Sequence, residues 1–98
     1  MITHVVSFRW KPGTTPEQVD AVEATLATMP GLVPSIKTYR FGRDLGVSAA
    51  DNMDFVIVAT FDSVDDWRAY DTHPEHDRAR AEVIRPLIAE RAAVQFQS

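Results

Sequence analysis

The sequence predicts an α+β fold of the ferredoxin-like type, a split βαβ sandwich in which helices cover one face of a four-stranded antiparallel sheet. Two observations lead to this prediction. The segments follow the order strand, helix, strand, strand, helices, strand, and the first segment alternates with a period of two. A chain of 98 residues has room for one hydrophobic core, so we expect a single domain over residues 1–98.

The first strand is predicted at residues 2–10, where β-branched and aromatic residues alternate with others. One face of this strand would be apolar except for His4. The residues of that face are Ile2, His4, Val6, Phe8 and Trp10.

A helix is predicted from Pro16 to about Met29. Thr15 can cap it, Pro16 suits its first position, and Gln18 completes a capping box. The Pro-Gly pair after Met29 should end it. Its apolar stripe consists of Val19, Val22, Leu26 and Met29.

Two further strands are predicted at residues 35–41 and 54–61, with the longest loop, residues 42–53, between them. The later strand is apolar at every position from Phe55 to Ala59. An antiparallel sheet with one face in water should alternate. Something must therefore cover the second face, and we expect a homodimer in which two copies pack sheet against sheet.

The rest of the chain predicts two helices and a closing strand at residues 92–97. Ser63 can cap the first, short helix. Pro74 would begin the second, which should run to about Ala89 and end or kink at Pro86. The inward residues of this last helix would be Ala79, Val83 and Leu87.

Composition narrows the classes of partner. Lys and Arg number 10 against 14 Asp and Glu, giving a net charge of −4, so we expect neither nucleic acid nor an anionic membrane as partner. There is no cysteine for a disulfide or a thiolate. The chain shows no signal-peptide pattern and no apolar run of about 20 residues, which predicts a soluble, cytoplasmic protein.

The stretch from Tyr70 to His76 concentrates groups that can move protons. The dipole of a helix beginning at Pro74 would keep His76 neutral, which is the form needed of a general base. Tyr70 could donate to an oxyanion. The structural alternative is that His73 caps the helix, His76 bonds a backbone carbonyl and Tyr70 is a packed aromatic.

His4 should face this stretch across the layer between sheet and helices. If the groups meet in a cavity, the catalytic candidates are His76, Tyr70 and His4. The aromatic residues around them would either line a ligand pocket or belong to the core. The candidate ligand-binding residues are His73, Phe8, Trp67 and Phe55.

A metal site is a further alternative, with a weak divalent ion near Asp71, His73 and Glu75. The spacing matches neither His-Glu-x-x-His nor another zinc pattern. A Gly-x-Ser-x-Gly turn and a phosphate-binding glycine loop are absent too. We therefore expect no metal ion and no organic cofactor.

Four pieces of the chain, in this order, resemble the stress-response A/B barrel (Dabb) family. They are His4-Val5-Val6-Ser7-Phe8, Gly42-x-Asp44, the segment 54–63, and Tyr70-x-x-His73-Pro74-x-His76. The resemblance implies a dimeric α/β barrel in which two sheets pack face to face.

One branch of that family, the plant polyketide cyclases such as olivetolic acid cyclase, closes a ring by intramolecular aldol condensation. Similarity to this branch implies that His76 is the general base and that Tyr70 and His4 act with it. Two positions differ. Phe55 replaces a histidine, and Gln95 replaces an acid that would orient the base histidine and stabilise its cation.

The resulting hypothesis is a cofactor-independent cyclase (an aldol-type lyase) or isomerase that abstracts a proton next to the carbonyl of a small oxygenated organic ligand. A non-catalytic stress-response or small-molecule-binding protein is the alternative. A third hypothesis is a haem-degrading monooxygenase. A related barrel superfamily suggests it through Trp67 and His76, although the first strand lacks that superfamily's asparagine.

Overall fold

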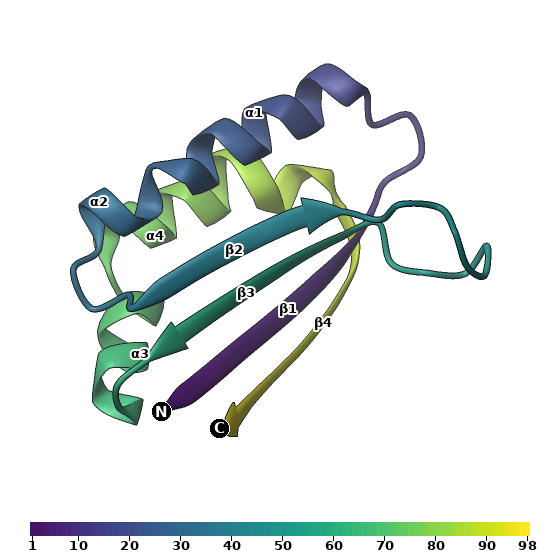
Figure 1. The fold of residues 1–98 in the computed structure, drawn as a ribbon. Helices are drawn as coiled ribbons and strands as arrows, with labels where there is room; N and C mark the ends of the chain where they lie inside the picture. Colours follow the sequence, from purple (N-terminus) through teal and green to yellow (C-terminus); the bar gives the residue numbers. More distant parts are fainter.

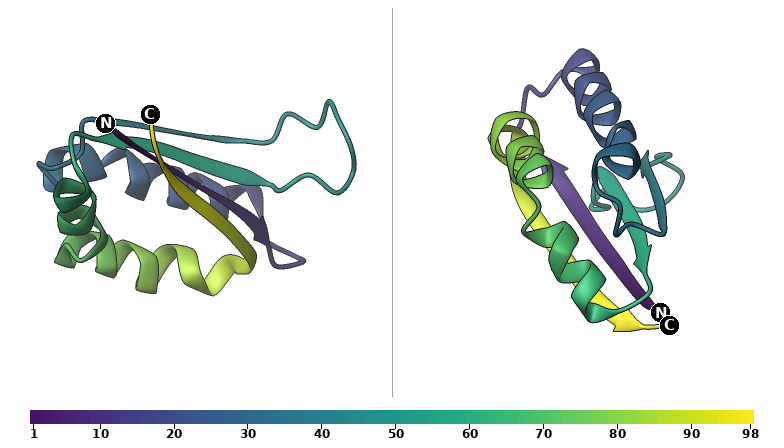
Figure 2. Two further views of the ribbon diagram at one scale, coloured as in Figure 1. Left: turned by 90° about the horizontal axis from the view of Figure 1, so that it is seen from below. Right: turned by 90° about the vertical axis from the view of Figure 1, so that its left-hand side faces the viewer.

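The computed structural model describes residues 1–98 and has the predicted α+β fold. Four antiparallel strands form one sheet in the order β2-β3-β1-β4. The helices all lie on one face of this sheet (Figure 1, Figure 2). The strands are β1 (Ile2–Trp10), β2 (Thr38–Arg43), β3 (Phe55–Phe61) and β4 (Ile88–Gln97).

Four α-helices and two shorter turns form the second layer. No helix has both the length and the apolar character needed to cross a membrane. The helices are α1 (Pro16–Ala27), α2 (Met29–Leu32), α3 (Val64–Asp71) and α4 (Pro74–Ala79). A π-helical turn (Arg80–Ile84) and a 3₁₀ turn (Arg85–Leu87) continue α4 to the last strand.

The start of α1 is as predicted. The Thr15 hydroxyl accepts from the backbone N–H of Gln18 at 3.2 Å, and the Gln18 side chain accepts from the backbone N–H of Thr15 at 2.8 Å. The whole predicted stripe is buried, although its last member belongs to α2 and not to α1. Its members are Val19, Val22, Leu26 and Met29.

The inner face of the sheet alternates as predicted for residues 2–10. His4 lies on this face, paired with Ala59 of β3 on one side and Gln95 of β4 on the other. Because Ala59 is small, the His4 ring keeps free space above it for side chains from the helices. The other buried residues of the inner strands are Ile2, Val6, Phe8, Phe55, Ile57 and Phe61.

Several predicted boundaries are wrong by a few residues. The second strand begins at Thr38, not at residue 35, because a turn joins the N–H of Ile36 to the carbonyl of Val33. The first helix ends at Ala27, and Pro30 belongs to the separate turn α2, where a proline near the start is tolerated.

The last helix was expected to reach Ala89, but β4 already begins at Ile88. Pro86 has no N–H to continue a helix, so the chain passes through one 3₁₀ turn and enters the sheet beside Trp10. The π turn has a further effect. The Arg85 N–H bonds the carbonyl of Arg80, five residues back, which moves the buried position from Val83 to Ile84.

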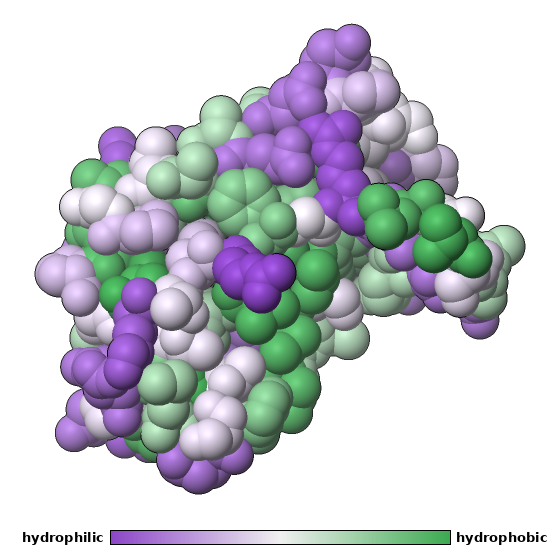
Figure 3. All heavy atoms as spheres, in the orientation of Figure 1, coloured by the Kyte–Doolittle hydropathy of each residue, from purple (hydrophilic) through white to green (hydrophobic).

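The outer face of the sheet has no helix over it. Val5 in β1 lies between Val58 of β3 and Val94 of β4, so a row of valines crosses the centre of this face. Val94 is 55% exposed and Phe96, farther along β4, is 47% exposed. Figure 3 shows a band of hydrophobic atoms over these strands.

The connection between β2 and β3 projects beyond the sheet (Figure 1, Figure 2). Two large apolar residues, Leu45 and Val47, are almost fully exposed on it. Figure 3 shows hydrophobic atoms on the projecting part of the surface.

Candidate functional site

A cavity of about 470 Å³ lies between the inner face of the sheet and the layer formed by α3, α4 and the turns that follow. This size is ordinary for a small-molecule site. Ten of the 16 residues that line the cavity are hydrophobic. The three catalytic candidates, His4, Tyr70 and His76, all line it, so segments far apart in sequence meet here.

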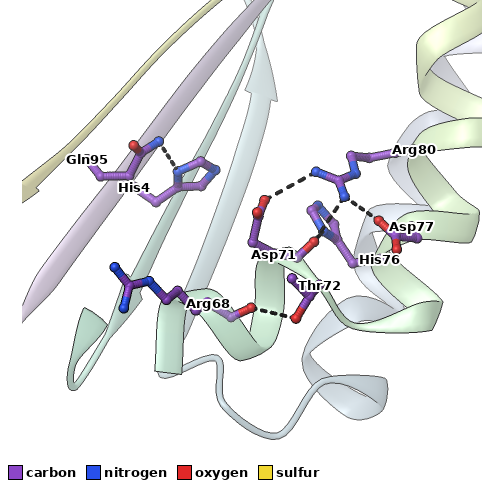
Figure 4. A network of polar contacts seen from close by, with 8 residues as sticks. All are labelled: His4, Arg68, Asp71, Thr72, His76, Asp77, Arg80 and Gln95. Carbon is purple, nitrogen blue, oxygen red and sulfur yellow. Dashed lines mark hydrogen bonds and ion pairs between the residues drawn. The ribbon is translucent and has the colours of Figure 1, made fainter. Parts of the chain in front are cut away.

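His4 is oriented by the last strand. Its side chain is buried, and the Gln95 amide nitrogen donates to His4 Nδ1 at 2.8 Å (Figure 4). With the Gln95 amide placed so that its nitrogen faces the ring, Nδ1 is assigned as the acceptor and the proton of the neutral ring as lying on Nε2. His4 is therefore a hydrogen-bond donor through Nε2.

His76 has the opposite arrangement. Its Nδ1 lies 3.3 Å from the carbonyl oxygen of Asp71, and a carbonyl can only accept, so Nδ1 carries the proton. The unprotonated nitrogen is Nε2. The ring also packs on Tyr70, with centroids 4.0 Å apart and planes inclined by 30°.

Both histidines are neutral at pH 7. Burial, and then the charge of Arg91, lower the pKa of His4 to about 4. Burial and the charge of Arg80 also lower the pKa of His76, against the bond to the Asp71 carbonyl, which raises it. Burial raises the pKa of Tyr70, which therefore keeps its hydroxyl proton.

Arg80 connects the end of α3 to α4 through hydrogen bonds to both (Figure 4). Its guanidinium donates to the Asp71 carboxylate at 3.2 Å and to the Asp71 carbonyl at 2.9 Å, and it also bonds Asp77. The Asp71 carbonyl thus receives bonds from both Arg80 and His76. This network fixes the orientation of the His76 ring.

The cavity also contains a polar atom with no protein partner. Trp67 Nε1 is buried and makes no hydrogen bond, whereas the buried hydroxyl of Tyr39 interacts with that of Tyr70. Trp67 and Tyr39 both line the cavity, and the Trp67 ring lies 6.2 Å from that of His4. A buried donor without a partner is costly, so a ligand oxygen could satisfy Trp67 Nε1.

Two of the predicted ligand-binding residues lie on the cavity and two lie elsewhere. Phe8 and Trp67 line it. His73 is the N-cap of α4, since its Nδ1 accepts from the backbone N–H of Glu75 at 3.1 Å. Phe55 is packed in the core between the rings of Trp10 and Phe41.

The expected partner of Gln95 also differs. The resemblance implied that this position orients the base histidine, but Gln95 bonds His4 and lies away from His76 (Figure 4). Sequence reasoning missed Tyr39, Arg80, Arg85 and Arg91 as cavity residues. The alternation of the second strand could have identified Tyr39. The positions of Arg80 and Arg85 depend on the packing of the turns after α4, and that of Arg91 on the early start of β4.

The possible metal ligands are engaged in other contacts. Asp71 pairs with Arg80, Glu75 pairs with Arg78, and His73 caps its helix. The structure contains no group of three or more histidine, aspartate or glutamate side chains that could hold a metal ion.

The fold and the site define a class: ferredoxin-like α+β proteins in which a cavity under the helical layer holds two neutral histidines and a tyrosine. The chain belongs to the Stress responsive A/B Barrel Domain family (Dabb), which matches residues 2–98. This confirms the family that the sequence motifs indicated.

Several solved structures are similar over nearly the whole chain. A dimeric ferredoxin-like protein of unknown function from Thermobifida fusca is 46% identical, with 99% of this chain and 90% of that chain covered and a TM-score of 0.90. A dimeric protein of unknown function from Bacteroides fragilis is 21% identical, with 99% and 95% covered and a TM-score of 0.84.

A hydroxynitrile lyase from Passiflora edulis is 23% identical, with 97% of this chain and 90% of that chain covered and a TM-score of 0.84. At this identity the similarity concerns the fold. No curated protein matches the chain.

Proposed function

We propose that the protein is a homodimer formed through the outer faces of two sheets. The support comes from the valine row Val5, Val58 and Val94, which an unpaired sheet would leave in water. The Thermobifida fusca relative, at 46% identity, is described as dimeric. Face-to-face packing of two such sheets makes the dimeric α/β barrel.

We further propose that the cavity binds a small oxygenated organic ligand and that His76 abstracts a proton next to the ligand's carbonyl group. One observation carries the proposal: His4 and His76 line one cavity as opposite tautomers, the first with a donor Nε2–H and the second with a basic Nε2. A base and an acid that are both neutral at pH 7 suit this chemistry.

The proposed step balances without a cofactor. Nε2 of His76 takes the proton from the carbon next to the carbonyl, and the C–H electron pair moves into the C–C bond as the carbonyl oxygen becomes an enolate. Tyr70 and His4 donate hydrogen bonds to that oxygen. In an aldol-type cyclisation the enolate carbon then attacks a second carbonyl, and the alkoxide that forms takes the proton back from His76. In an isomerisation His76 returns the proton to another carbon of the enolate system. Either course restores neutral His76.

A binding protein without catalysis is the second candidate. The observation that favours it is the network at the α3–α4 junction, where His76 and Arg80 both bond the Asp71 carbonyl. In this role His76 holds the helices together. The haem-degrading hypothesis receives no comparable support, since β1 has no asparagine.

The experiment follows exchange of α-hydrogens for deuterium by NMR in D₂O, with two ketones, 4-phenylbutan-2-one and 4-benzoylbutanoate. The wild-type protein should accelerate exchange over buffer for at least one of them. His76→Gln should lower the rate by a factor of roughly 10² to 10⁴, and Tyr70→Phe by about 10². The control is His73→Asn, which changes a histidine outside the cavity.

Thermal unfolding of the same variants separates the two candidates. If His76→Gln loses exchange and keeps its melting temperature, the catalytic proposal holds. If the wild-type protein accelerates no exchange and His76→Gln lowers the melting temperature, the histidine is structural and the catalytic proposal is wrong.

A further inference from the structure

The cavity has the opposite charge balance to the chain. The chain carries a net charge of −4. The charged side chains that line the cavity are three arginines, Arg80, Arg85 and Arg91, and a single carboxylate, Asp71. Because both histidines are neutral, the cavity as a whole is positive.

Only one of the three arginines is neutralised. Arg80 is paired with Asp71 and Asp77. Arg85 and Arg91 form no ion pair and no side-chain hydrogen bond, whereas Arg9, Arg43, Arg68 and Arg78 elsewhere on the surface each have an acidic partner. Arg40, on the exposed side of β2, is also unpaired but does not line the cavity. Two guanidinium groups without an ion-pair partner therefore line the cavity.

These two arginines lie where the cavity meets solvent. Arg91 is on the inner face of β4, paired with Phe8, and Arg85 directly follows the buried Ile84. Both arginines are exposed although they line the cavity, so they mark its mouth. Phe8 is four residues from His4 along β1, which corresponds to roughly 13 Å at the rise of a β-strand.

We propose that the ligand of this cavity is an organic carboxylate, with an apolar body inside the cavity and its anionic group held by Arg85 and Arg91 at the mouth. The proposal deepens the proposed function and rests on it only in that the cavity is a ligand site. It adds the chemical class of the ligand and its orientation, with the apolar end inside the cavity and the charged end at the mouth.

The chemistry of the lining supports a carboxylate. Guanidinium groups bind carboxylates with two parallel, charge-assisted hydrogen bonds. The interior wall is apolar, with Val6, Leu26 and Ile57 among its residues, and suits a hydrocarbon or aromatic body. A neutral ligand would leave both arginines without a counter-charge, and a cation would be repelled.

The position of Arg91 links the anion to the catalytic end. Its charge is one cause of the low pKa of His4. Burial is the largest cause of that low pKa, and a carboxylate bound to Arg91 would offset only the part that the arginine charge contributes.

The test uses calorimetric titration of the full-length protein with three ligands that share one body: 4-phenylbutanoate, 4-phenylbutan-1-ol and 4-phenylbutylamine. The acid should bind at least about tenfold more tightly than the alcohol, and the amine most weakly. Arg85→Gln and Arg91→Gln should each weaken binding of the acid about tenfold and leave binding of the alcohol unchanged.

The matched control is Arg68→Gln. It removes the same charge from the exposed surface of α3, outside the cavity, and should leave binding of the acid unchanged. Both test positions are exposed, so the variants should fold, which circular dichroism checks.

Equal affinities for acid and alcohol would overturn the proposal, as would a double variant R85Q/R91Q that binds the acid like the wild type. Acid preference without any α-hydrogen exchange would support this inference and contradict the proposed chemistry. Exchange without acid preference would support the proposed chemistry and contradict this inference. The failure of one proposal can therefore be told from the failure of the other.

Discussion

The two faces of the sheet have similar apolar character and different surroundings. On the inner face, Phe61 and Ile57 are buried under helices of the same chain. On the outer face, Val94 and Phe96 remain about half exposed. The residues proposed to transfer protons lie on the inner side, where His4 shares a cavity with Tyr70 and His76. The comparison indicates that the inner face forms the hydrophobic core and the site, while the outer face is available for packing against a second copy of the chain.

The largest expected effect is on the free energy of unfolding, and it differs between a buried phenylalanine of the inner face and a half-exposed one of the outer face. Phe61→Ala should lower the free energy of unfolding by about 3–5 kcal/mol, because it leaves a cavity under Tyr70, whose ring centroid is 5.1 Å from that of Phe61. Phe96→Ala should cost less than about 1 kcal/mol at low protein concentration and more as the concentration rises. Urea unfolding at two concentrations measures both; equal losses would contradict the comparison.

The next effect concerns assembly. Val5→Glu places a charge at the centre of the outer face, between Val58 and Val94, and should raise the dimer dissociation constant by about 10² or more, since an unpaired buried charge costs about 3–5 kcal/mol. Ala24→Glu adds the same charge to the exposed side of α1 and should not affect assembly. Sedimentation velocity decides; identical dimerisation of both variants would exclude the outer face.

The third prediction is a pH dependence that arises from the inner face. The pKa of His4 falls from 6.5 to about 4 on folding, so the unfolded chain binds more protons between these values. Stability should therefore be complete above about pH 6.5 and decrease as the pH falls toward 4. The lowered pKa of His76 acts in the same direction. Melting temperatures at pH 7 and 5.5 should differ less in His4→Gln, and an equal difference would contradict the assignment.

The smallest effect is expected at the helix cap. His73→Ala removes the acceptor for the N–H of Glu75 and should lower the free energy of unfolding by about 0.5–1 kcal/mol. In His73→Asn the new side chain can still cap the helix, so most of this stability should be kept. Ligand binding should be unchanged in both. A loss of ligand affinity in His73→Asn would bring this residue back into the site.

Local patterns were sufficient for most of the fold. The alternation of residues 2–10, the capping box at Thr15 and the Pro74 helix start are short-range features, and each appears in the structure. The predicted boundaries failed where the outcome depends on distant partners. The π turn after Ala79 and the early start of β4 arise because the chain must reach the sheet edge beside β1.

Some features of the site also follow from local patterns, and others depend on distant parts of the chain. The sequence by itself determined the family, the strand and helix order and the concentration of proton-carrying groups at Tyr70 and His76, because these depend on residue types and their spacing. Only the tertiary structure decided which nitrogen of each histidine carries the proton, that Gln95 serves His4, and that Arg85 and Arg91 stand unpaired at a cavity. Tautomers, burial and charge balance depend on the atoms that surround a group, and those atoms come from elements that are distant in the chain.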